Sequence, residues 1–227
     1  MSEGRVLVID DEPQIHRFLK PALAAAGYDT VQALTAADAE RLAATSAPDV
    51  IILDLGLPDK DGKEVIRSLR AWSKLPIIVL SARGEEAEKI EALDLGADDY
   101  VEKPFGIGEL LARIRTALRH REPAAISMSR FDVGDLSIDL AKRIVSRDGE
   151  RVHLTPKEYD LLAYMARHAG LVMTHRQLLV AVWGPAHGED LHYLRVFIGQ
   201  LRSKVERDPS SPDLIRTEPG VGYRFAE

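Results

Sequence analysis

Four short runs in the first half of the chain end in side chains of types that can bind metal ions or phosphoryl groups. These side chains are Asp10 and Asp11, Asp54, Ser81 and Lys103. Carboxylate oxygens are ligands that Mg²⁺ prefers, and an ammonium group offsets the charge of phosphoryl oxygens. If the runs bring these groups to one place, the expected chemistry is transfer of a phosphoryl group to a carboxylate beside a divalent cation.

The runs themselves predict how these side chains are positioned. They are Val6–Ile9, Val50–Leu53, Ile77–Leu80 and Asp98–Val101, and a further strand is expected near Asp29–Ala33. Short, largely apolar and β-branched runs are typical of parallel strands that are buried on both faces. In an open α/β sheet the carboxyl ends of the strands share one edge, and ligands bind there.

Helical patterns separate the strands. Apolar residues recur at helical spacing from Ile15 to Leu23, until Gly27 ends the pattern. Further helices are predicted over 36–46, through Val65 to Leu69, over 85–95 and over 107–120. Five strands that alternate with five helices predict an α/β fold, a doubly wound parallel sheet with helices on both faces.

Within this site Asp54 is the predicted nucleophile, because a carboxylate at the end of a buried strand is held rigidly. Asp11 and Asp54 are expected to bind Mg²⁺ (or Mn²⁺) directly, the Gly56 carbonyl to supply another oxygen, and Asp10 to act through water. Lys103 is expected to contact the phosphoryl oxygens. Acidic residues at strand ends are also common helix N-caps, but that alternative does not explain the lysine and the serine. The Lys103–Pro104 bond can be cis or trans.

Composition excludes several classes of function. The chain has no cysteine, so it forms no disulfide and no thiolate-ligated metal site. No apolar run reaches the roughly 18 residues of a membrane-spanning helix, and no apolar signal segment precedes the first strand; a cytoplasmic protein without a membrane partner is expected. Residues 1–127 hold 16 Lys and Arg against 22 Asp and Glu, and residues 128–227 hold 14 of each. The net charge of −6 therefore says little about partners of the second half.

The second half of the chain has a different pattern. We expect a first domain over 1–121, a linker over 122–129 and a second domain over 130–227, which begins with a four-stranded antiparallel sheet over 130–153. Thr155 and Thr174 each begin a capping-box sequence that opens a helix. A third helix is expected from Asp190 to about Glu206, and a hairpin over 214–225. This order of elements predicts an α+β winged helix-turn-helix domain.

Several motifs carry a resemblance to a known family. Five motifs of the first half resemble those of receiver domains in two-component response regulators. They are Asp10-Asp11-Glu12, Ile52–Pro58, Ser81-Ala82-Arg83, Gly96–Tyr100 and Lys103-Pro104-Phe105. With Leu154-Thr155-Pro156, Val182-Trp183-Gly184 and Gly220–Phe225, the whole chain resembles the OmpR/PhoB-type transcription regulators, with a receiver of the CheY/flavodoxin-like fold. Within that family, Asp54–Asp61, Ile107–Leu110, Trp183–Pro185 and His192–Arg195 resemble regulators of high-affinity potassium uptake.

The resemblance implies partners and a switch. A sensor histidine kinase would phosphorylate Asp54, and promoter DNA with repeated half-sites and RNA polymerase would be partners. Ser81 would move toward the phosphoryl group, and the Tyr100 ring would turn into the vacated space. The receivers would then pair as a homodimer through one face that carries both charge signs. The residues expected on this face are Lys89, Asp94, Asp98, Asp99, Glu109, Arg113 and Arg115.

The charges on this face suggest how two receivers pair. Lys89 would meet Glu109, Asp94 would meet Arg115, and Asp99 would meet Arg113 of the second copy. An ordinary solvated charge mosaic is the alternative, because surface ion pairs are individually weak.

The third helix of the second domain is the predicted DNA reader. Leu194, Ile198, Leu201 and Val205 recur at helical spacing and are expected to face the core. Amide, small and arginine side chains suit base edges and phosphates. The residues expected at the DNA are His192, Tyr193, Arg195, Val196, Gly199, Gln200, Arg202, Lys204, Thr217 and Tyr223. A solvated helix surface is the alternative, and Pro219, where relatives often carry arginine, leaves a minor-groove contact open.

Two other functions compete with this interpretation. A phosphatase of the haloacid dehalogenase type also uses a strand-end Asp, a hydroxyl, a lysine and Mg²⁺. That class needs an acid two residues after the nucleophile, where this chain has Gly56. We therefore expect no enzyme activity beyond the receiver's own phosphoryl transfer and hydrolysis. A receiver joined to a protein-binding winged helix is the other alternative, and salt-sensitive binding to DNA would discriminate it.

Overall fold

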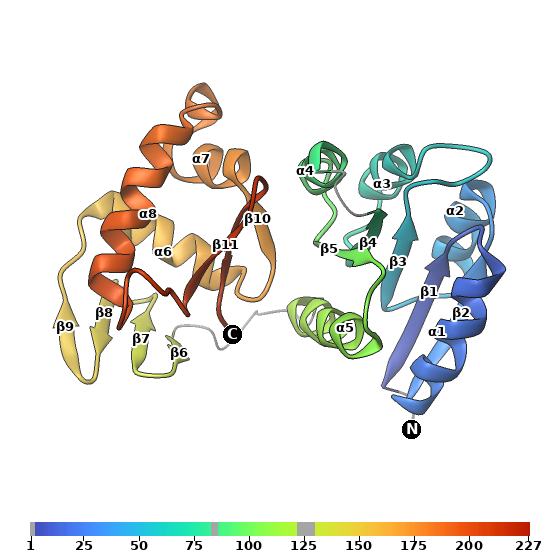
Figure 1. Ribbon diagram of the computed structural model, residues 1–227, viewed down its shortest axis with the longest axis horizontal. Coiled ribbons are helices and arrows are strands. Elements are labelled where there is room, and N and C mark those ends of the chain that lie inside the picture. Colours follow the sequence, from blue (N-terminus) through green and yellow to red (C-terminus); the bar gives the residue numbers. More distant parts are fainter. Residues whose placement is uncertain (1–2, 83–85, 122–129) are drawn as a thin grey trace. The chain divides into compact units, whose positions relative to one another are not determined.

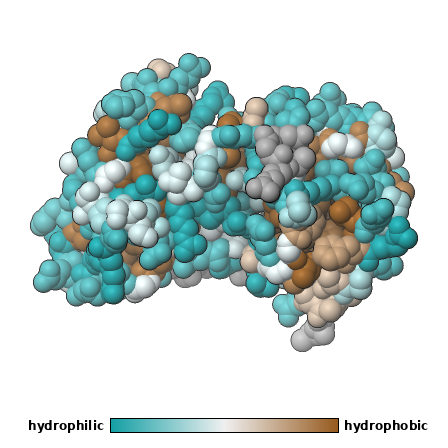
Figure 2. All heavy atoms as spheres, in the orientation of Figure 1, coloured by the Kyte–Doolittle hydropathy of each residue, from teal (hydrophilic) through white to brown (hydrophobic). Residues whose placement is uncertain are grey.

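The computed structural model describes residues 3–82, 86–121 and 130–227. The chain divides into two units, Met1–Glu122 and Pro123–Glu227. The linker predicted over 122–129 and Arg83 of the serine motif lie outside the described residues. Within the described ranges, no helix combines the length and the hydropathy needed to cross a membrane. Hydrophilic side chains cover most of the face shown in Figure 2.

The first unit is built on a parallel sheet with the strand order β2-β1-β3-β4-β5 (Figure 1). The strands are β1 (Gly4–Ile9), β2 (Tyr28–Ala33), β3 (Val50–Asp54), β4 (Ile77–Ala82) and β5 (Asp99–Lys103). The apolar residues of β1, β3 and β4 are almost all fully buried, because helices cover both faces of the sheet. The predicted doubly wound five-stranded sheet is therefore confirmed.

Five helices cover this sheet. They are α1 (Pro13–Ala25), α2 (Ala36–Thr45), α3 (Gly62–Arg70), α4 (Glu86–Asp94) and α5 (Ile107–Arg121). Helices α1 and α5 lie on one face, and α2 and α3 lie on the other (Figure 1). Leu19 and Leu23 of α1 and Leu110 and Ile114 of α5 belong to one buried apolar cluster with the strands. The helical spacing of these residues follows from that single buried stripe.

Arg70, the last residue of α3, ties together the loops at the amino ends of β4 and β5. Its guanidinium donates hydrogen bonds to the carbonyls of Gly96 (2.8 Å) and Leu75 (2.7 Å). It also forms an ion pair with Asp98 at 2.8 Å, and Asp98 accepts a hydrogen bond from the Ile77 amide at 2.8 Å. Asp98, predicted as the first residue of the last strand, therefore precedes β5 and belongs to this network.

The strand register brings the predicted chemical groups to one edge. Ile9 pairs with Leu53, so the residues that follow β1 lie beside the end of β3. On the other side of β3, Asp54 pairs with Leu80 of β4, and Ser81 pairs with Glu102 of β5. The chain adds β2 on one side of β1 and β3 on the other, so the order in which strands are added changes direction between β1 and β3. Open α/β sheets bind ligands at such a position.

The second unit starts with an antiparallel sheet in the order β6-β7-β8-β9, as predicted. Its strands are β6 (Arg130–Val133), β7 (Leu136–Asp139), β8 (Ile144–Arg147) and β9 (Glu150–Val152). The elements that follow are α6 (Pro156–Arg167), β10 (Val172–Thr174), α7 (His175–Trp183), the 3₁₀ turn η1 (Pro185–His187), α8 (Leu191–Val205), β11 (Ile215–Glu218) and β12 (Gly222–Phe225). Both predicted capping boxes are present, Thr155 with Glu158 and Thr174 with Gln177. The winged helix-turn-helix order is confirmed.

One strand of this unit was missing from the prediction. β10 pairs antiparallel with β12, which makes the hairpin of β11 and β12 part of a three-stranded sheet. Arg224 of β12 donates a hydrogen bond to the Gly170 carbonyl and forms an ion pair with Glu218 at 2.6 Å. The wing is thereby fixed to the turn that precedes β10.

Candidate functional site

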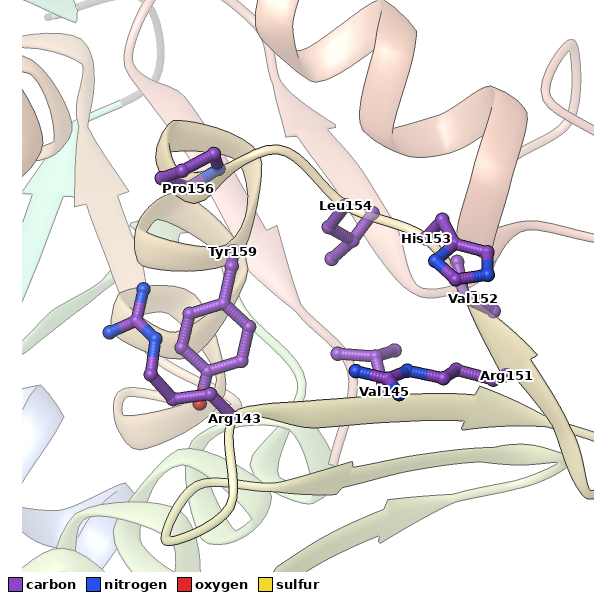
Figure 3. A pocket seen from close by; sticks show the side chains of 8 residues that line it. All are labelled: Arg143, Val145, Arg151, Val152, His153, Leu154, Pro156 and Tyr159. Atoms are coloured by element: carbon purple, nitrogen blue, oxygen red, sulfur yellow. The ribbon is translucent and has the colours of Figure 1, made fainter.

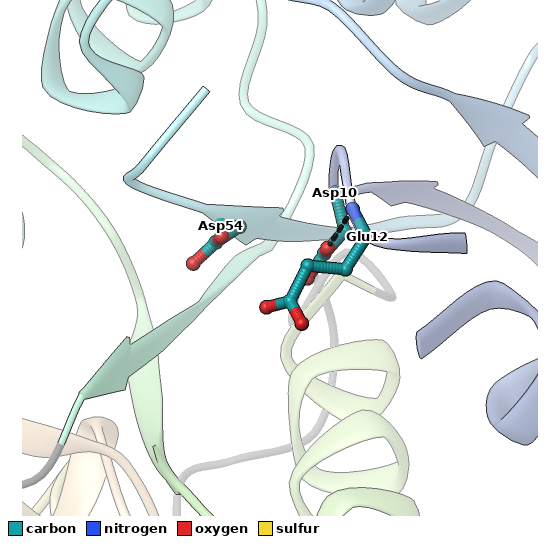
Figure 4. Close-up of side chains that lie close together, drawn as sticks. All are labelled: Asp10, Glu12 and Asp54. Carbon is teal, nitrogen blue, oxygen red and sulfur yellow. Dashed lines mark hydrogen bonds between the residues drawn. The ribbon is translucent and has the colours of Figure 1, made fainter. Parts of the chain in front are cut away.

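Three carboxylates lie together at the carboxyl edge of the parallel sheet (Figure 4). One oxygen from each of Asp10, Glu12 and Asp54 lies within 4.8 Å of the other two. Asp10 is buried, Asp54 is half-buried and Glu12 is exposed. The Glu12 amide donates a hydrogen bond to Asp10 Oδ1 at 2.8 Å, which holds the turn after β1 in place. Carboxylates this close repel one another, so the cluster fits a divalent cation with oxygen ligands.

Lys103 lies among these carboxylates although it is 93 positions from Asp10 in the sequence. Its Nζ atom is 3.1 Å from Asp10 Oδ2, 3.2 Å from Asp54 Oδ2 and 3.3 Å from Glu12 Oε1. The Lys103–Pro104 peptide bond is cis. One ammonium group therefore contacts every member of the acidic cluster, and it lies beside the carboxylate predicted to accept a phosphoryl group.

The charges in this cluster act on the pKa of Asp54 in opposite directions. Burial, the largest cause, raises this pKa, Lys103 lowers it, and the charges of Asp10 and Asp11 raise it again; the outcome is a pKa above the ordinary value. Burial alone would lower the pKa of Lys103, but the carboxylates of Asp54 and Asp10 outweigh it and raise that pKa. A further cation would favour the ionised form of Asp54, which is the form that the predicted attack on phosphorus requires.

Ser81 contributes a hydroxyl to the same place. An open pocket of about 620 Å³ is lined by Glu12, Asp54, Leu55, Gly56, Leu57, Asp61, Leu80, Ser81, Glu88 and Lys103. Ser81 is 2% exposed, and its Oγ atom has no hydrogen-bond partner among the described residues. A buried hydroxyl without a partner costs free energy, so it fits a group that bonds an incoming oxygen atom.

The turn after β1 contributes one carboxylate that was not predicted. Asp11, predicted as a direct metal ligand, is exposed and is not one of the three clustered carboxylates, but its charge still acts on Asp54. Glu12 belongs to the cluster and was not among the predicted site residues. The signal for Glu12 was present, because it is the third carboxylate in the run that follows β1. Gly56 lines the pocket, and a Cβ atom there would make an ordinary 3.7 Å contact with Asp54.

Several charges predicted to meet a second receiver have partners within the same chain. Lys89 is 4% exposed and pairs with Glu102, while its ammonium lies 5.1 Å from the centre of the Tyr100 ring. Arg113 lies 3.4 Å from Asp99 and 3.9 Å from Glu109. Asp98 is engaged by Arg70, as described above. Arg115 and Glu109 are exposed, and Asp94 is half-buried.

Helix α8 presents two distinct faces. The predicted core residues Leu194, Ile198, Leu201 and Val205 are all buried. The exposed residues of its first two-thirds are Leu191, His192, Tyr193, Arg195, Val196, Gly199 and Gln200. Trp183 contacts both Tyr193 and Phe197 through edge-to-face ring pairs, with centroids 5.4 and 5.1 Å apart. This aromatic cluster holds the start of α8 against the end of α7.

Four other residues predicted at the DNA are engaged inside the unit. Lys204 lies 2.7 Å from both carboxylate oxygens of the buried Glu158. Arg202 donates hydrogen bonds to the Ile215 carbonyl (2.6 Å) and to Thr217 Oγ1 (2.8 Å). Tyr223 is 5% exposed, and this burial does not fit a phosphate contact. These side chains fix α8 to α6 and to the wing.

The second unit also has a pocket of about 200 Å³ between β8, β9 and the start of α6 (Figure 3). Two arginines and a histidine line it, but none of the predicted site residues does. Arg143 is hydrogen-bonded to Asp160 at 2.7 Å and stacks 4.1 Å over the Tyr159 ring. None of the lining residues has a buried polar atom without a partner that could hold a ligand.

Comparisons with known proteins agree with both units. Residues 6–115 match the family model "Response regulator receiver domain", and residues 149–225 match "Transcriptional regulatory protein, C terminal". The chain belongs to the OmpR/PhoB-type response regulators. As a response regulator it is a DNA-binding transcription factor of a two-component system and not an enzyme in the ordinary sense.

Individual relatives extend over nearly the whole response regulator. It is 53% identical over 220 residues to the KDP operon transcriptional regulatory protein KdpE of Escherichia coli (strain K12), covering 97% of this chain and 98% of that protein. It is 51% identical over 221 residues to KdpE of Mycobacterium tuberculosis (strain CDC 1551 / Oshkosh), with the same coverage. The crystal structure of DrrB from Thermotoga maritima, an OmpR/PhoB homolog, matches with a TM-score of 0.51 and 32% identity over all of both chains.

Proposed function

We propose that the response regulator accepts a phosphoryl group on Asp54 from a sensor histidine kinase. The observation that carries this proposal is the convergence of Asp54, Lys103 and the acidic cluster in one pocket. Beside them lies the Ser81 hydroxyl, which has no hydrogen-bond partner within the described part of the chain. An oxygen of Asp54 attacks the phosphorus of the kinase's phosphohistidine, the P–N bond breaks and the imidazole leaves, while Lys103 offsets the charge of the transferred oxygens. Asp10, Asp11, Asp54 and the Gly56 carbonyl would hold Mg²⁺ or Mn²⁺, with Glu12 as an additional oxygen donor. The metal neutralises charge on the phosphoryl group when it is bound.

The signal then has to pass from this pocket to the second unit. Ser81 bonds a phosphoryl oxygen, Tyr100 turns inward, and the surface of α4, β5 and α5 pairs with a second copy. The paired response regulators bind repeated half-sites in promoter DNA through the exposed residues of α8 and recruit RNA polymerase. In this proposal the receiver spans 1–121, the linker 122–129 and the DNA-binding domain 130–227. The protein works in the cytoplasm, and its receiver also hydrolyses its own phosphoaspartate.

We further propose that its target is an operon like the KDP operon, which the name of the Escherichia coli relative KdpE gives. The sequence resemblance links that group of regulators to high-affinity potassium uptake. Enrichment of bound genomic DNA from the organism that carries the chain would identify the promoter, and absence of a potassium-uptake operon from the enriched set would reject this target.

The central test labels the full chain with acetyl phosphate in the presence of Mg²⁺. We expect a phosphorylated band in wild type, none in Asp54→Asn, and an unchanged band in the control Asp29→Asn, which alters an exposed carboxylate on β2. Labelling that persists in Asp54→Asn would place the acceptor elsewhere. DNA binding measured across a salt titration tests the second unit, because binding to DNA weakens steeply with salt and binding to a protein partner need not.

A further inference from the structure

Lys89 on α4 is tied to the strand that carries Tyr100. The Lys89 side chain is 4% exposed, and its ammonium forms an ion pair with Glu102. The same ammonium lies 5.1 Å from the centre of the Tyr100 ring, within the range of a cation–π interaction. Tyr100 and Glu102 are two residues apart on β5, so their side chains leave the same face of the strand. A single ammonium group therefore holds two residues of β5 against α4.

This arrangement conflicts with the pairing proposed for active receivers. In that pairing Lys89 meets Glu109 of a second copy. A lysine that is 4% exposed and already neutralised by Glu102 offers almost no charge to a partner. Glu109 is exposed at the start of α5 and lies 3.9 Å from Arg113 of its own chain. Pairing of two receivers therefore requires Lys89 to leave its internal partners.

We propose that Glu102 acts as an internal competitor that keeps Lys89 from a second copy of this chain until Tyr100 turns inward. This inference rests on the proposed function, because the phosphoryl group supplies the signal. When Tyr100 withdraws, the ammonium loses its aromatic contact and, among the described residues, keeps the ion pair with Glu102, whose side chain is 45% exposed. A pair open to water on one side is weak, so Lys89 extends outward and exchanges Glu102 for Glu109 of the partner.

The exchange makes the two events depend on each other. One carboxylate partner of Lys89 replaces another, so the net gain in ion pairs is small. The position of Tyr100 therefore decides whether Lys89 pairs with Glu102 or with Glu109 of the second copy. A receiver that pairs also draws Lys89 away from the ring and favours the inward position of Tyr100. Coupling of this kind is reciprocal by thermodynamic necessity.

The test measures the dissociation constant of the homodimer by sedimentation of the full chain, with and without beryllofluoride and Mg²⁺ as a stable phosphoryl mimic. The forms compared are wild type, Glu102→Gln, Lys89→Gln and the double variant. Glu40→Gln is the matched control, because it removes one carboxylate from a half-exposed Lys–Glu pair on the same unit, with Lys60 at 3.2 Å. Melting temperatures verify that each variant is folded.

Without the mimic, Glu102→Gln is expected to tighten the dimer roughly two- to fivefold, which is the strength of a partly exposed ion pair. Glu40→Gln is expected to leave it unchanged. Lys89→Gln weakens the dimer formed with the mimic, and adding Glu102→Gln to Lys89→Gln has no further effect, because Glu102 acts only through Lys89.

The outcomes separate the competitor role of Glu102 from the phosphoryl switch of the proposed function. If Glu102→Gln behaves like Glu40→Gln, or still tightens the dimer when Lys89 is absent, the competitor role of Glu102 is refuted. If wild type does not respond to the mimic but Glu102→Gln tightens the dimer, the competitor role stands and the phosphoryl switch falls. If neither responds, both are refuted.

Discussion

Replacing Lys204 tests whether this residue supports the fold or contacts DNA. Its ammonium lies 2.7 Å from both oxygens of Glu158, a carboxylate that is 2% exposed. Lys204→Met therefore removes the cationic partner of this buried charge and leaves it with hydrogen bonds from Thr155. Breaking a buried ion pair costs about 3–5 kcal/mol, and the 35% exposure of the Lys204 side chain reduces this to about 2 kcal/mol. For a domain of this size the expected fall in melting temperature is about 8 °C, measurable by calorimetry of the full chain.

The fall in melting temperature caused by Lys204→Met should depend on pH through the ionisation of Glu158. Burial acts to raise its pKa, but the hydrogen bonds from Lys204 and the Thr155 amide outweigh burial and hold the pKa below its ordinary value. A carboxyl whose folded pKa is depressed stabilises the fold above its unfolded pKa of about 4.3, and this contribution disappears as pH falls through the folded value. The difference in melting temperature between wild type and Lys204→Met should be full at pH 7 and shrink below about pH 4.

The matched control is Lys142→Met, which breaks an exposed pair with Asp139 at 3.7 Å and should cost about 0.5 kcal/mol or less. The salt dependence of DNA binding supplies a second measurement. Lys204→Met should keep the wild-type slope, whereas loss of a phosphate contact lowers it by about one. A variant with an unchanged melting temperature and a reduced slope would refute the structural role of Lys204.

Three further changes have defined outcomes. Ser81→Ala should leave the melting temperature of the receiver unchanged or slightly higher, since no described residue hydrogen-bonds the buried hydroxyl, yet abolish dimerisation by beryllofluoride in sedimentation; a fall of several degrees would reveal an unrecognised partner. Glu12→Gln should weaken Mg²⁺ binding about tenfold in titration calorimetry, as expected for a supporting carboxylate, and unchanged affinity would exclude Glu12 from the metal site. Thr155→Ala should lower unfolding free energy by about 1 kcal/mol in urea, because the capping box of α6 is lost, and no change would show that the box is redundant.

The sequence predicted those parts of the molecule that depend on local pattern. Apolar runs predict the buried strands. Thr155 and Thr174 predict the starts of two helices, because the hydrogen bonds of a capping box form between residues close in sequence. The end of each parallel strand then places Asp54, Ser81 and Lys103 at one edge without any knowledge of side-chain conformation.

The parts that sequence did not predict depend on tertiary partners. β10 is three residues long and exists because β12 pairs with it, so no periodicity marks it. Which carboxylate after β1 enters the cluster depends on the backbone of the turn, where Glu12 is the N-cap of α1 with an extended conformation. The internal partners of Lys89 and Lys204 come from strand register and helix packing, which charge patterning alone cannot specify.

The network around Arg70 restrains one end of β4 and of β5 in the receiver. By joining the end of α3 to the Leu75 and Gly96 carbonyls and to Asp98, this arginine anchors the amino ends of β4 and β5 and the segment after α4. Chemistry at Asp54 acts on the far ends of the same strands. We therefore expect a displacement near Ser81 to move the ends of α4 and β5 that lie near Asp54, while the ends held by Arg70 stay in place.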